Sequence, residues 1–224
     1  MRSLRVLSRL LTYPEAELFV HMDEMKAVLT GERLLKGRKL EAVTGFMDRL
    51  AATGLMDAQE TYVELFDRGR AHCLHLFEHV HGESHFRGQA MIELAARYAD
   101  KGLYIGTAEL PDYLPLFLEF VSICELREGQ ETLGQAAPVI ATIGEKLRRR
   151  DSGYAVVMEA IVALSGVRLS RADIRKAADA AMPDIQTLDD LDKEWAEPAA
   201  FDGAPACGTC DENGLPALQQ IKGA

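Results

Sequence analysis

Apolar side chains recur at helical spacing along almost the whole of residues 1–182, and this periodicity constrains the fold more than any other feature. The first stripe is formed by Leu4, Leu7 and Leu10, which share one helix face because their spacing follows the 3.6-residue period. No segment of convincing length alternates apolar and polar residues, as a half-buried strand would. The chain is therefore predicted to be all-α, with a single globular domain of about eight or nine helices.

Glycine and proline residues indicate where several of these helices begin and end. Pro14 is expected to open a helix that Gly31 ends, and Gly54 is expected to end the next helix. Gly102 is the expected C-terminal cap of a later helix. Pro111 is predicted to be the first residue of the helix that follows, where its missing amide hydrogen costs nothing.

Charge divides the chain into two parts. Residues 183–224 carry nine acidic and two basic side chains, whereas residues 1–182 carry 26 acidic and 23 basic ones. The second part also has few periodic apolar positions and contains several proline and glycine residues. We therefore predict a helical domain over 1–182 and an acidic, mostly disordered tail over 183–224, with a short helical turn around Leu188–Trp195.

Composition argues against several classes of protein. A formal net charge of −10 does not suit broad nucleic-acid binding, which needs a basic surface. No apolar run approaches the 18 residues of a membrane span, so stable membrane insertion is not expected. Arginines interrupt the first apolar residues, whereas a signal peptide has an uninterrupted apolar segment. Four cysteines in a chain of this length do not make a disulfide framework. The predicted location is the cytoplasm.

Five of the six histidines lie between His72 and His85. The spacing of His72, His75 and His79 places them on one face of a helix, and His75, Glu78 and His79 match the H-x-x-E-H pattern of zinc peptidases. A peptidase would also need a third ligand, which is not evident. We favour a structural or regulatory role, including pH-dependent partner binding, and predict no catalytic residue and no metal site. A metal-binding protein that uses this cluster is the alternative.

Cys207 and Cys210 form a C-x-x-C motif in the acidic tail. One such pair supplies two of the four ligands that tetrahedral zinc requires, so a metal would need ligands from a second protein or a dimer mate. A surface thiol pair is the favoured interpretation, and a redox or metal-delivery role is the alternative. Cys73 and Cys124 lie in helical apolar patterns and are expected in the core.

A third group of residues combines aromatic, acidic and histidine side chains at helix ends and turns. It occupies the stretches 62–91 and 109–120. A groove for an amphipathic peptide needs such a combination, with an apolar floor and a charged rim. Ordinary core aromatics with solvated charges explain the same pattern equally well.

These stretches resemble the nitrate reductase molybdenum-cofactor assembly chaperones, the NarJ-type or delta-subunit proteins, within the wider TorD-like family of redox-enzyme maturation chaperones. The resemblance runs from Leu10-Leu-Thr-Tyr-Pro14 to about Leu164. It is densest in the run Leu76-Phe-Glu-His-Val-His-Gly-Glu-Ser, which is followed by Arg87-Gly-Gln-Ala-Met. A second dense element is Glu109-x-Pro-Asp112, which Tyr113 follows here.

The resemblance implies a TorD-like, all-helical, cytoplasmic chaperone with no catalytic activity and no cofactor of its own. Such proteins bind the N-terminal segment of the apo catalytic (alpha) subunit of a membrane-bound respiratory nitrate reductase, and that segment resembles a twin-arginine leader. They hold the subunit competent for molybdenum cofactor insertion and membrane assembly, and they are not part of the final enzyme. Cofactor-delivery proteins are further expected partners.

A leader of this kind carries basic residues beside an apolar helical face. The expected site therefore combines aromatic side chains as a floor with carboxylates and histidines around it. The predicted peptide-binding residues are Tyr62, Glu64, Phe66, Asp67, His75, His79, Glu109, Asp112, Tyr113, Phe117 and Glu119.

Overall fold

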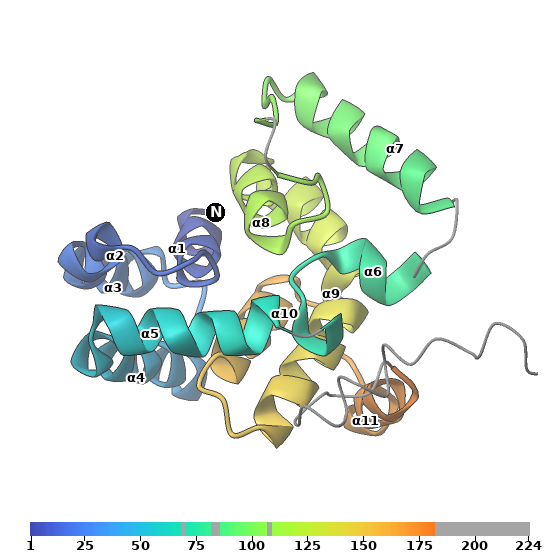
Figure 1. Ribbon diagram of the computed structural model, residues 1–224. Helices are drawn as coiled ribbons and strands as arrows, with labels where there is room; N and C mark the ends of the chain where they lie inside the picture. Colours follow the sequence, from blue (N-terminus) through green and yellow to red (C-terminus); the bar gives the residue numbers. More distant parts are fainter. Residues whose placement is uncertain (69, 82–85, 107–108, 182–224) are drawn as a thin grey trace, which may run out of the picture. The chain divides into compact units, whose positions relative to one another are not determined.

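The computed structural model describes residues 1–68, 70–81, 86–106 and 109–181, and these ranges are mostly helical (Figure 1). No β-strand is assigned within them, so the prediction of an all-α fold is confirmed. A π-helical turn, Val63–Asp67, continues directly from α5, and a 3₁₀ turn, Arg70–His72, follows it. The α-helices of the described ranges are α1 (Arg2–Leu10), α2 (Ala16–Val20), α3 (Met22–Glu32), α4 (Arg38–Thr53), α5 (Leu55–Tyr62), α6 (Leu76–His81), α7 (Phe86–Asp100), α8 (Leu114–Ile123), α9 (Leu126–Arg149), α10 (Ala155–Leu164) and α11 (Arg171–Ala180).

The described helices outnumber the eight or nine expected, in part because the helix predicted between Pro14 and Gly31 is divided. Its two parts, α2 and α3, are separated at His21, where ψ is 9° and the backbone leaves the α-helical region. Gly31 does not end the second part. The helix continues to Glu32 and ends at Arg33, which adopts a left-handed conformation with a φ of 57°.

Two of the predicted helix ends agree with the structure. Gly54 follows α4 with a φ of 91°, and Gly102 lies just beyond α7 with a φ of 76°, a region that glycine enters without steric cost. The helix expected at Pro111 begins later, at Leu114. The Pro111 carbonyl instead accepts a hydrogen bond of 2.7 Å from the hydroxyl of Tyr98 in α7.

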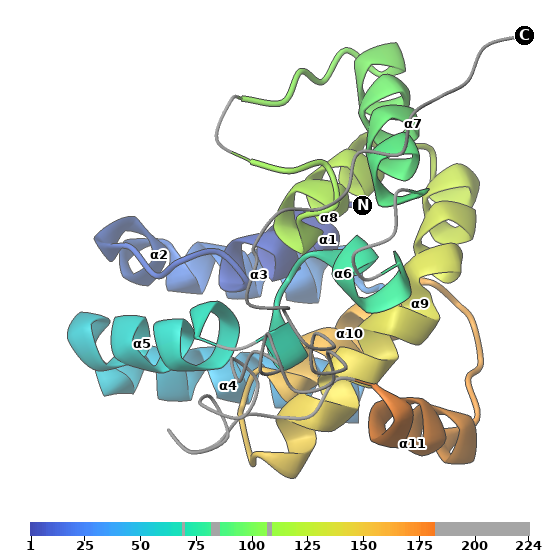
Figure 2. The same cartoon turned by 45° about the vertical axis from the view of Figure 1, so that its right-hand side comes forward.

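Helix α9 contacts α6, α8, α10 and α11, and it lies beside α6 and α10 in both Figure 1 and Figure 2. Leu133, Ile140 and Leu147 form its fully buried face. Gly144 allows α10 to approach closely, because a Cβ at this position would lie 2.9 Å from the Cβ of Met158. The two helices therefore form the base against which the other elements of the C-terminal half pack.

Helix α1 is a core element, as its leucine stripe predicted. Leu4, Leu7 and Leu10 have no exposed surface. The hydroxyl of Ser8, which is also buried, donates a hydrogen bond of 2.8 Å to the carbonyl of Pro115 in α8. This bond and the leucine stripe join the beginning of the chain to the helix that follows the Glu109–Asp112 element.

The predicted tail of residues 183–224 lies outside the described residues, together with the turn expected around Leu188–Trp195 and the pair Cys207 and Cys210. The division of the chain at residue 182 therefore stays a prediction. None of the helices in the described ranges is both long enough and apolar enough to cross a membrane.

Candidate functional site

Two loops that are far apart in the sequence pair as neighbouring backbone segments. The amide of Leu76 donates to the carbonyl of Asp112 at 3.0 Å, and the amide of Leu114 donates to the carbonyl of Leu74 at 2.8 Å. Between these two bonds, His75 and Tyr113 form an antiparallel bridge. Directly opposed residues in such a pair project to the same face, and the two rings lie 5.5 Å apart.

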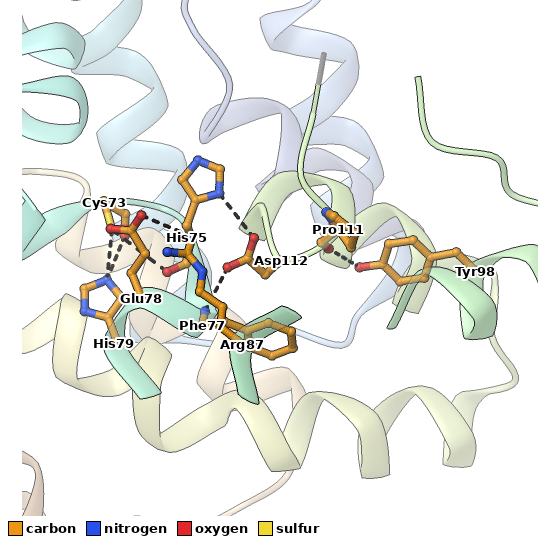
Figure 3. A network of polar contacts seen from close by, with 9 residues as sticks. All are labelled: Cys73, His75, Phe77, Glu78, His79, Arg87, Tyr98, Pro111 and Asp112. Atoms are coloured by element: carbon orange, nitrogen blue, oxygen red, sulfur yellow. Dashed lines mark hydrogen bonds and ion pairs between the residues drawn. The ribbon is translucent and has the colours of Figure 1, made fainter. Parts of the chain in front are cut away.

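The carboxylate of Asp112 ties these loops to the start of α6. It has no exposed surface, and its Oδ2 accepts a hydrogen bond of 2.9 Å from the amide of Phe77 in the first turn of that helix. Its Oδ1 lies 3.4 Å from Nδ1 of His75 (Figure 3). This hydrogen bond to Asp112 outweighs the opposing effect of burial and raises the pKa of His75. One buried group therefore positions both the helix start and the imidazole.

The junction of α5 with the π-helical turn supplies the aromatic side of the site. Tyr62 ends α5, and its ring lies 4.9 Å from the ring of Phe66 in the turn. The Tyr62 hydroxyl donates to the carbonyl of Leu11 at 2.9 Å and lies 3.2 Å from the hydroxyl of Tyr113. π-Helical turns are rare and often occur at functional sites. Here the turn continues to Asp67, whose carboxylate is exposed.

These segments surround a hollow of about 320 Å³, which we call the aromatic hollow. It brings together six of the predicted peptide-binding residues. The hollow is lined by Tyr13, Tyr62, Phe66, Asp67, Leu74, His75, Glu109 and Tyr113.

The aromatic hollow has a negative electrostatic character. Burial raises the pKa of Tyr113, and the carboxylates of Glu109 and Asp67 raise it further, although the hydrogen bond with Tyr62 acts the other way. Burial also raises the pKa of Tyr62, with added contributions from Tyr113 and Asp67. Both hydroxyls therefore stay protonated at neutral pH. Because Asp67 and Glu109 are exposed, their charges are available to a basic partner.

Five of the predicted residues do not line this hollow: Glu64, His79, Asp112, Phe117 and Glu119. Phe117 is buried in the core on α8, and Glu119 is exposed on the same helix. Glu64 is exposed and lines a separate hollow of about 410 Å³ with residues of α4 and with Tyr154. Glu64 lies two residues before Phe66, about half a helical turn, so the two side chains point in different directions.

His79 belongs to a different cluster, with Cys73, Glu78 and Arg87 (Figure 3). The Cys73 thiol donates to Oε2 of Glu78 at 3.2 Å, and Nε2 of His79 lies 2.9 Å from the Cys73 carbonyl oxygen. Burial raises the pKa of Cys73 to about 12, so its thiol stays protonated and unreactive. Burial likewise lowers the pKa of His79. Nη2 of Arg87 pairs with Oε1 of Glu78 at 3.2 Å. Because Glu78 is in α6 and Arg87 is in α7, this ion pair links the two helices.

The prediction that three histidines share one helix face is wrong. Helix α6 begins only at Leu76, so that His79 alone of the three lies within it. His72 ends the 3₁₀ turn, and His75 lies in the bridge with Tyr113. The helix starts late because the carboxylate that caps its first turn comes from a remote loop, which the local spacing of the histidines does not reveal.

Sequence reasoning also missed residues that line the aromatic hollow. The ring of Tyr13 meets the ring of Tyr62 edge-on at 5.7 Å, and Leu74 completes the lining. Tyr13 was detectable, because it lies in the Leu10–Pro14 run that carries part of the family resemblance. Tyr154 packs against Phe66 with ring centroids 5.0 Å apart, and no local pattern indicates this support.

Comparison with known proteins gives the family. The model of the nitrate reductase delta subunit family matches residues 35–159. The chain is 41% identical over 198 residues to the nitrate reductase molybdenum cofactor assembly chaperone NarJ of Escherichia coli strain K12. The aligned residues are 88% of this chain and 83% of the relative. It is 35% identical over 216 residues to the probable assembly chaperone NarW of the same strain, with 95% and 90% covered.

A more distant relative comes from a different bacterium. The probable nitrate reductase molybdenum cofactor assembly chaperone NarJ of Bacillus subtilis strain 168 is 27% identical over 178 residues, which are 79% of this chain and 92% of the relative. The chain therefore belongs to the nitrate reductase delta subunit family, and the three relatives described above are named as established or probable molybdenum cofactor assembly chaperones. This is a non-catalytic family, and the chain is not an enzyme.

Proposed function

We propose that this chaperone binds the N-terminal, leader-like segment of the apo catalytic (alpha) subunit of a respiratory nitrate reductase in the aromatic hollow. It holds the subunit competent for molybdenum cofactor insertion and membrane assembly and then leaves the finished enzyme. The observation that carries the proposal is the convergence of rings from separate segments around an acidic opening. The apolar face of such a leader would contact Tyr13, Tyr62 and Tyr113, and its basic residues would lie near Asp67 and Glu109.

The size of the hollow suggests how the segment binds. A volume of about 320 Å³ is at the lower end of the range for small-molecule pockets, so it accepts a few side chains rather than a whole helix. The side chain of Tyr13 is 46% exposed and extends the apolar surface at one edge. We infer that one or two apolar side chains of the leader are anchored in the hollow while the rest of its helix lies across the opening.

The cellular setting belongs to the same proposal. We place the protein in the cytoplasm, where the apo catalytic subunit is made, with cofactor-delivery proteins as transient partners. Both cysteines in the described ranges, Cys73 and Cys124, are free thiols, as expected in a reducing compartment.

The test is a calorimetric titration of the full chain with a synthetic peptide of about the first twenty residues of the catalytic subunit from the same organism, a length that allows roughly five helical turns. We expect saturable binding of the native peptide and none of a scrambled peptide. The double variant Asp67→Asn with Glu109→Gln should weaken binding by about three- to tenfold at low salt, because each exposed ion pair contributes about 0.2–1 kcal/mol.

The matched control is Glu64→Gln with Glu119→Gln, which removes the same charge from exposed carboxylates that do not line the aromatic hollow. This control should bind the peptide as the unmodified chain does. Equal weakening by both double variants would show a diffuse effect of net charge and would contradict the proposed site. The difference between the two variants should also shrink at high salt, because exposed charges are screened.

The alternative, a metal-binding or redox protein, gains no support from the described ranges. No group of three histidine, cysteine or acidic residues there could hold a metal ion. His85, Cys207 and Cys210 lie outside those ranges, so this alternative stays a prediction. It requires stoichiometric metal in the purified chain, or a loss of leader affinity in the variant Cys207→Ser with Cys210→Ser.

A further inference from the structure

A larger hollow of about 560 Å³ lies among α9, α10 and α11, away from every residue that the proposed function uses. We call it the basic hollow. Two carboxylates, those of Glu145 and Glu159, are outnumbered there by cationic side chains. These cations are Lys39, Arg148, Arg168, Arg171 and Arg175.

Glu145 organises one side of this hollow. Its side chain is only 10% exposed, and its carboxylate pairs with Arg148, Arg149 and Arg175, the last at 3.9 Å. Burial acts to raise the pKa of Glu145, but the hydrogen bonds from Arg148 and Arg149 outweigh it and hold the pKa below its usual value. Three guanidinium groups around one carboxylate leave an excess of positive charge. Arg149 has a second partner in Asp179, at 2.7 Å, and Arg148 donates two hydrogen bonds to Glu145, so the excess lies on Arg175.

Three further cations line the basic hollow together with Glu159. Lys39, Arg168 and Arg171 are exposed and have no ion-pair partner among the residues that the structure describes. Arg168 and Arg171 flank the start of α11, three residues apart. Guanidinium groups present paired N–H donors that match the oxygens of a phosphate group. Two arginines that line one hollow, without an ion-pair partner among the described residues, therefore favour an anion with several oxygen atoms.

The lining between the cations is apolar. Val162 on α10, Val167 and Leu169 in the following loop and Ile174 on α11 all contribute to it. Val167 is 41% exposed, although it is a large apolar residue. A volume of about 560 Å³ lies within the usual range for pockets that bind small organic molecules, which is about 300–1,000 Å³. A ligand that covers this surface has an apolar body as well as negative charge.

We propose that the basic hollow is a binding site for an organic phosphate, a molecule that joins phosphate groups to a ring of nucleobase type. The phosphate oxygens bind Arg168, Arg171 and Arg175, and the ring lies on Val162 and Ile174. The site is independent of leader binding, because the two hollows share no residue. An acidic peptide is the competing occupant, and it would need neither the depth of the hollow nor a planar ring.

The experiment is a calorimetric titration of the full chain with ATP, and separately with inorganic pyrophosphate, at low salt in a buffer without phosphate. We expect one saturable site for ATP. Pyrophosphate should bind at least about tenfold more weakly, because it has no ring to contact the apolar lining. The double variant Arg168→Ala with Arg171→Ala should lower the affinity for ATP at least about tenfold. Its affinity for the leader peptide should not change.

The matched control is Arg5→Ala with Lys36→Ala, which removes the same charge at exposed positions outside both hollows. It should change the affinity for ATP by less than about twofold, or about 0.4 kcal/mol. Four results would overturn the proposal. These are no saturable binding of ATP, equal affinity for pyrophosphate and ATP, equal weakening by both double variants, and displacement of ATP by polyglutamate at lower concentrations than by pyrophosphate.

Discussion

The aromatic hollow and the basic hollow differ in how the chain builds them. The first draws its lining from four separate segments between Tyr13 and Tyr113, held together by ring contacts and by a buried carboxylate. The second draws its lining from α9, α10, α11 and the loop between α10 and α11, which follow one another in the sequence, with Lys39 added from α4. One site therefore depends on long-range contacts, and the other depends mostly on the packing of successive helices.

Their chemistry differs in the same sense. The aromatic hollow has rigid rings, two exposed carboxylates and hydroxyls held in place by hydrogen bonds. The basic hollow has long, flexible arginine side chains around Glu145. The interactions of these arginines with an anion weaken as salt screens the charges. Shape should therefore dominate recognition in the first hollow, and charge should dominate in the second.

The largest effect is expected from Asp112→Ala, which removes the carboxylate that links the loop before α8 to His75 and to the start of α6. The variant leaves the amide of Phe77 and the ring of His75 without their buried partner. We expect the free energy of unfolding to fall by about 3 kcal/mol, the usual cost of breaking a buried pair by removing one member. Leader affinity should be lost, whereas ATP binding in the basic hollow should be retained. Urea denaturation and both titrations measure this.

The control for that variant is Glu119→Ala, which changes an exposed carboxylate on the neighbouring helix. Its free energy of unfolding should stay within about 0.5 kcal/mol of that of the unmodified chain. If Asp112→Ala were as stable as this control and still bound the leader, the long-range tie would not be what holds the aromatic hollow together.

A smaller effect is expected from Tyr62→Phe, which keeps the ring and removes only the hydroxyl. The buried carbonyl of Leu11 then loses its donor, and Tyr113 loses a hydrogen-bond partner. We expect the free energy of unfolding to fall by about 1–2 kcal/mol, as measured by urea denaturation. Tyr104→Phe is the matched change at an exposed tyrosine and should have no measurable effect. Equal stability of the two variants would show that the hydroxyl pair does not stiffen the hollow.

The smallest effect is expected from pH, and it should have opposite signs at two histidines. The hydrogen bond to Asp112 raises the pKa of His75, so this residue stabilises the fold below pH about 6.5 and the contribution is lost as pH rises through the folded-state value. Burial lowers the pKa of His79, so stability is lost there as pH falls from about 6.5 through the folded-state value.

Urea denaturation at about pH 5.5 and about pH 8, on either side of the usual histidine pKa, measures both effects. His75→Gln should lower the free energy of unfolding more at the acidic pH than at the basic one. His79→Gln should remove part of the loss of stability that the unmodified chain shows on acidification. Parallel changes in both variants would contradict the assignment of these histidines to two different environments.

Much of the local structure was predictable from the sequence. The stripe of Leu4, Leu7 and Leu10 and the glycines at 54 and 102 identified helices and helix ends correctly, because both depend on residues within one or two turns. The acidic and aromatic character of these residues was also evident in the 62–91 and 109–120 stretches, and the family resemblance is the basis of the proposal that they bind a leader.

The placement of side chains was decided only by tertiary structure. The sequence does not show that Asp112 caps a helix 35 residues earlier, so the start of α6 at Leu76 could not be foreseen. Tertiary packing likewise places Phe117 in the core and brings Leu74 into the lining of the aromatic hollow. Helical periodicity is local because its hydrogen bonds join residues four apart, whereas a hollow exists only where packing brings distant segments together. Local sequence patterns therefore account for the helical class and for the chemistry available, whereas tertiary packing sets which side chains share a surface.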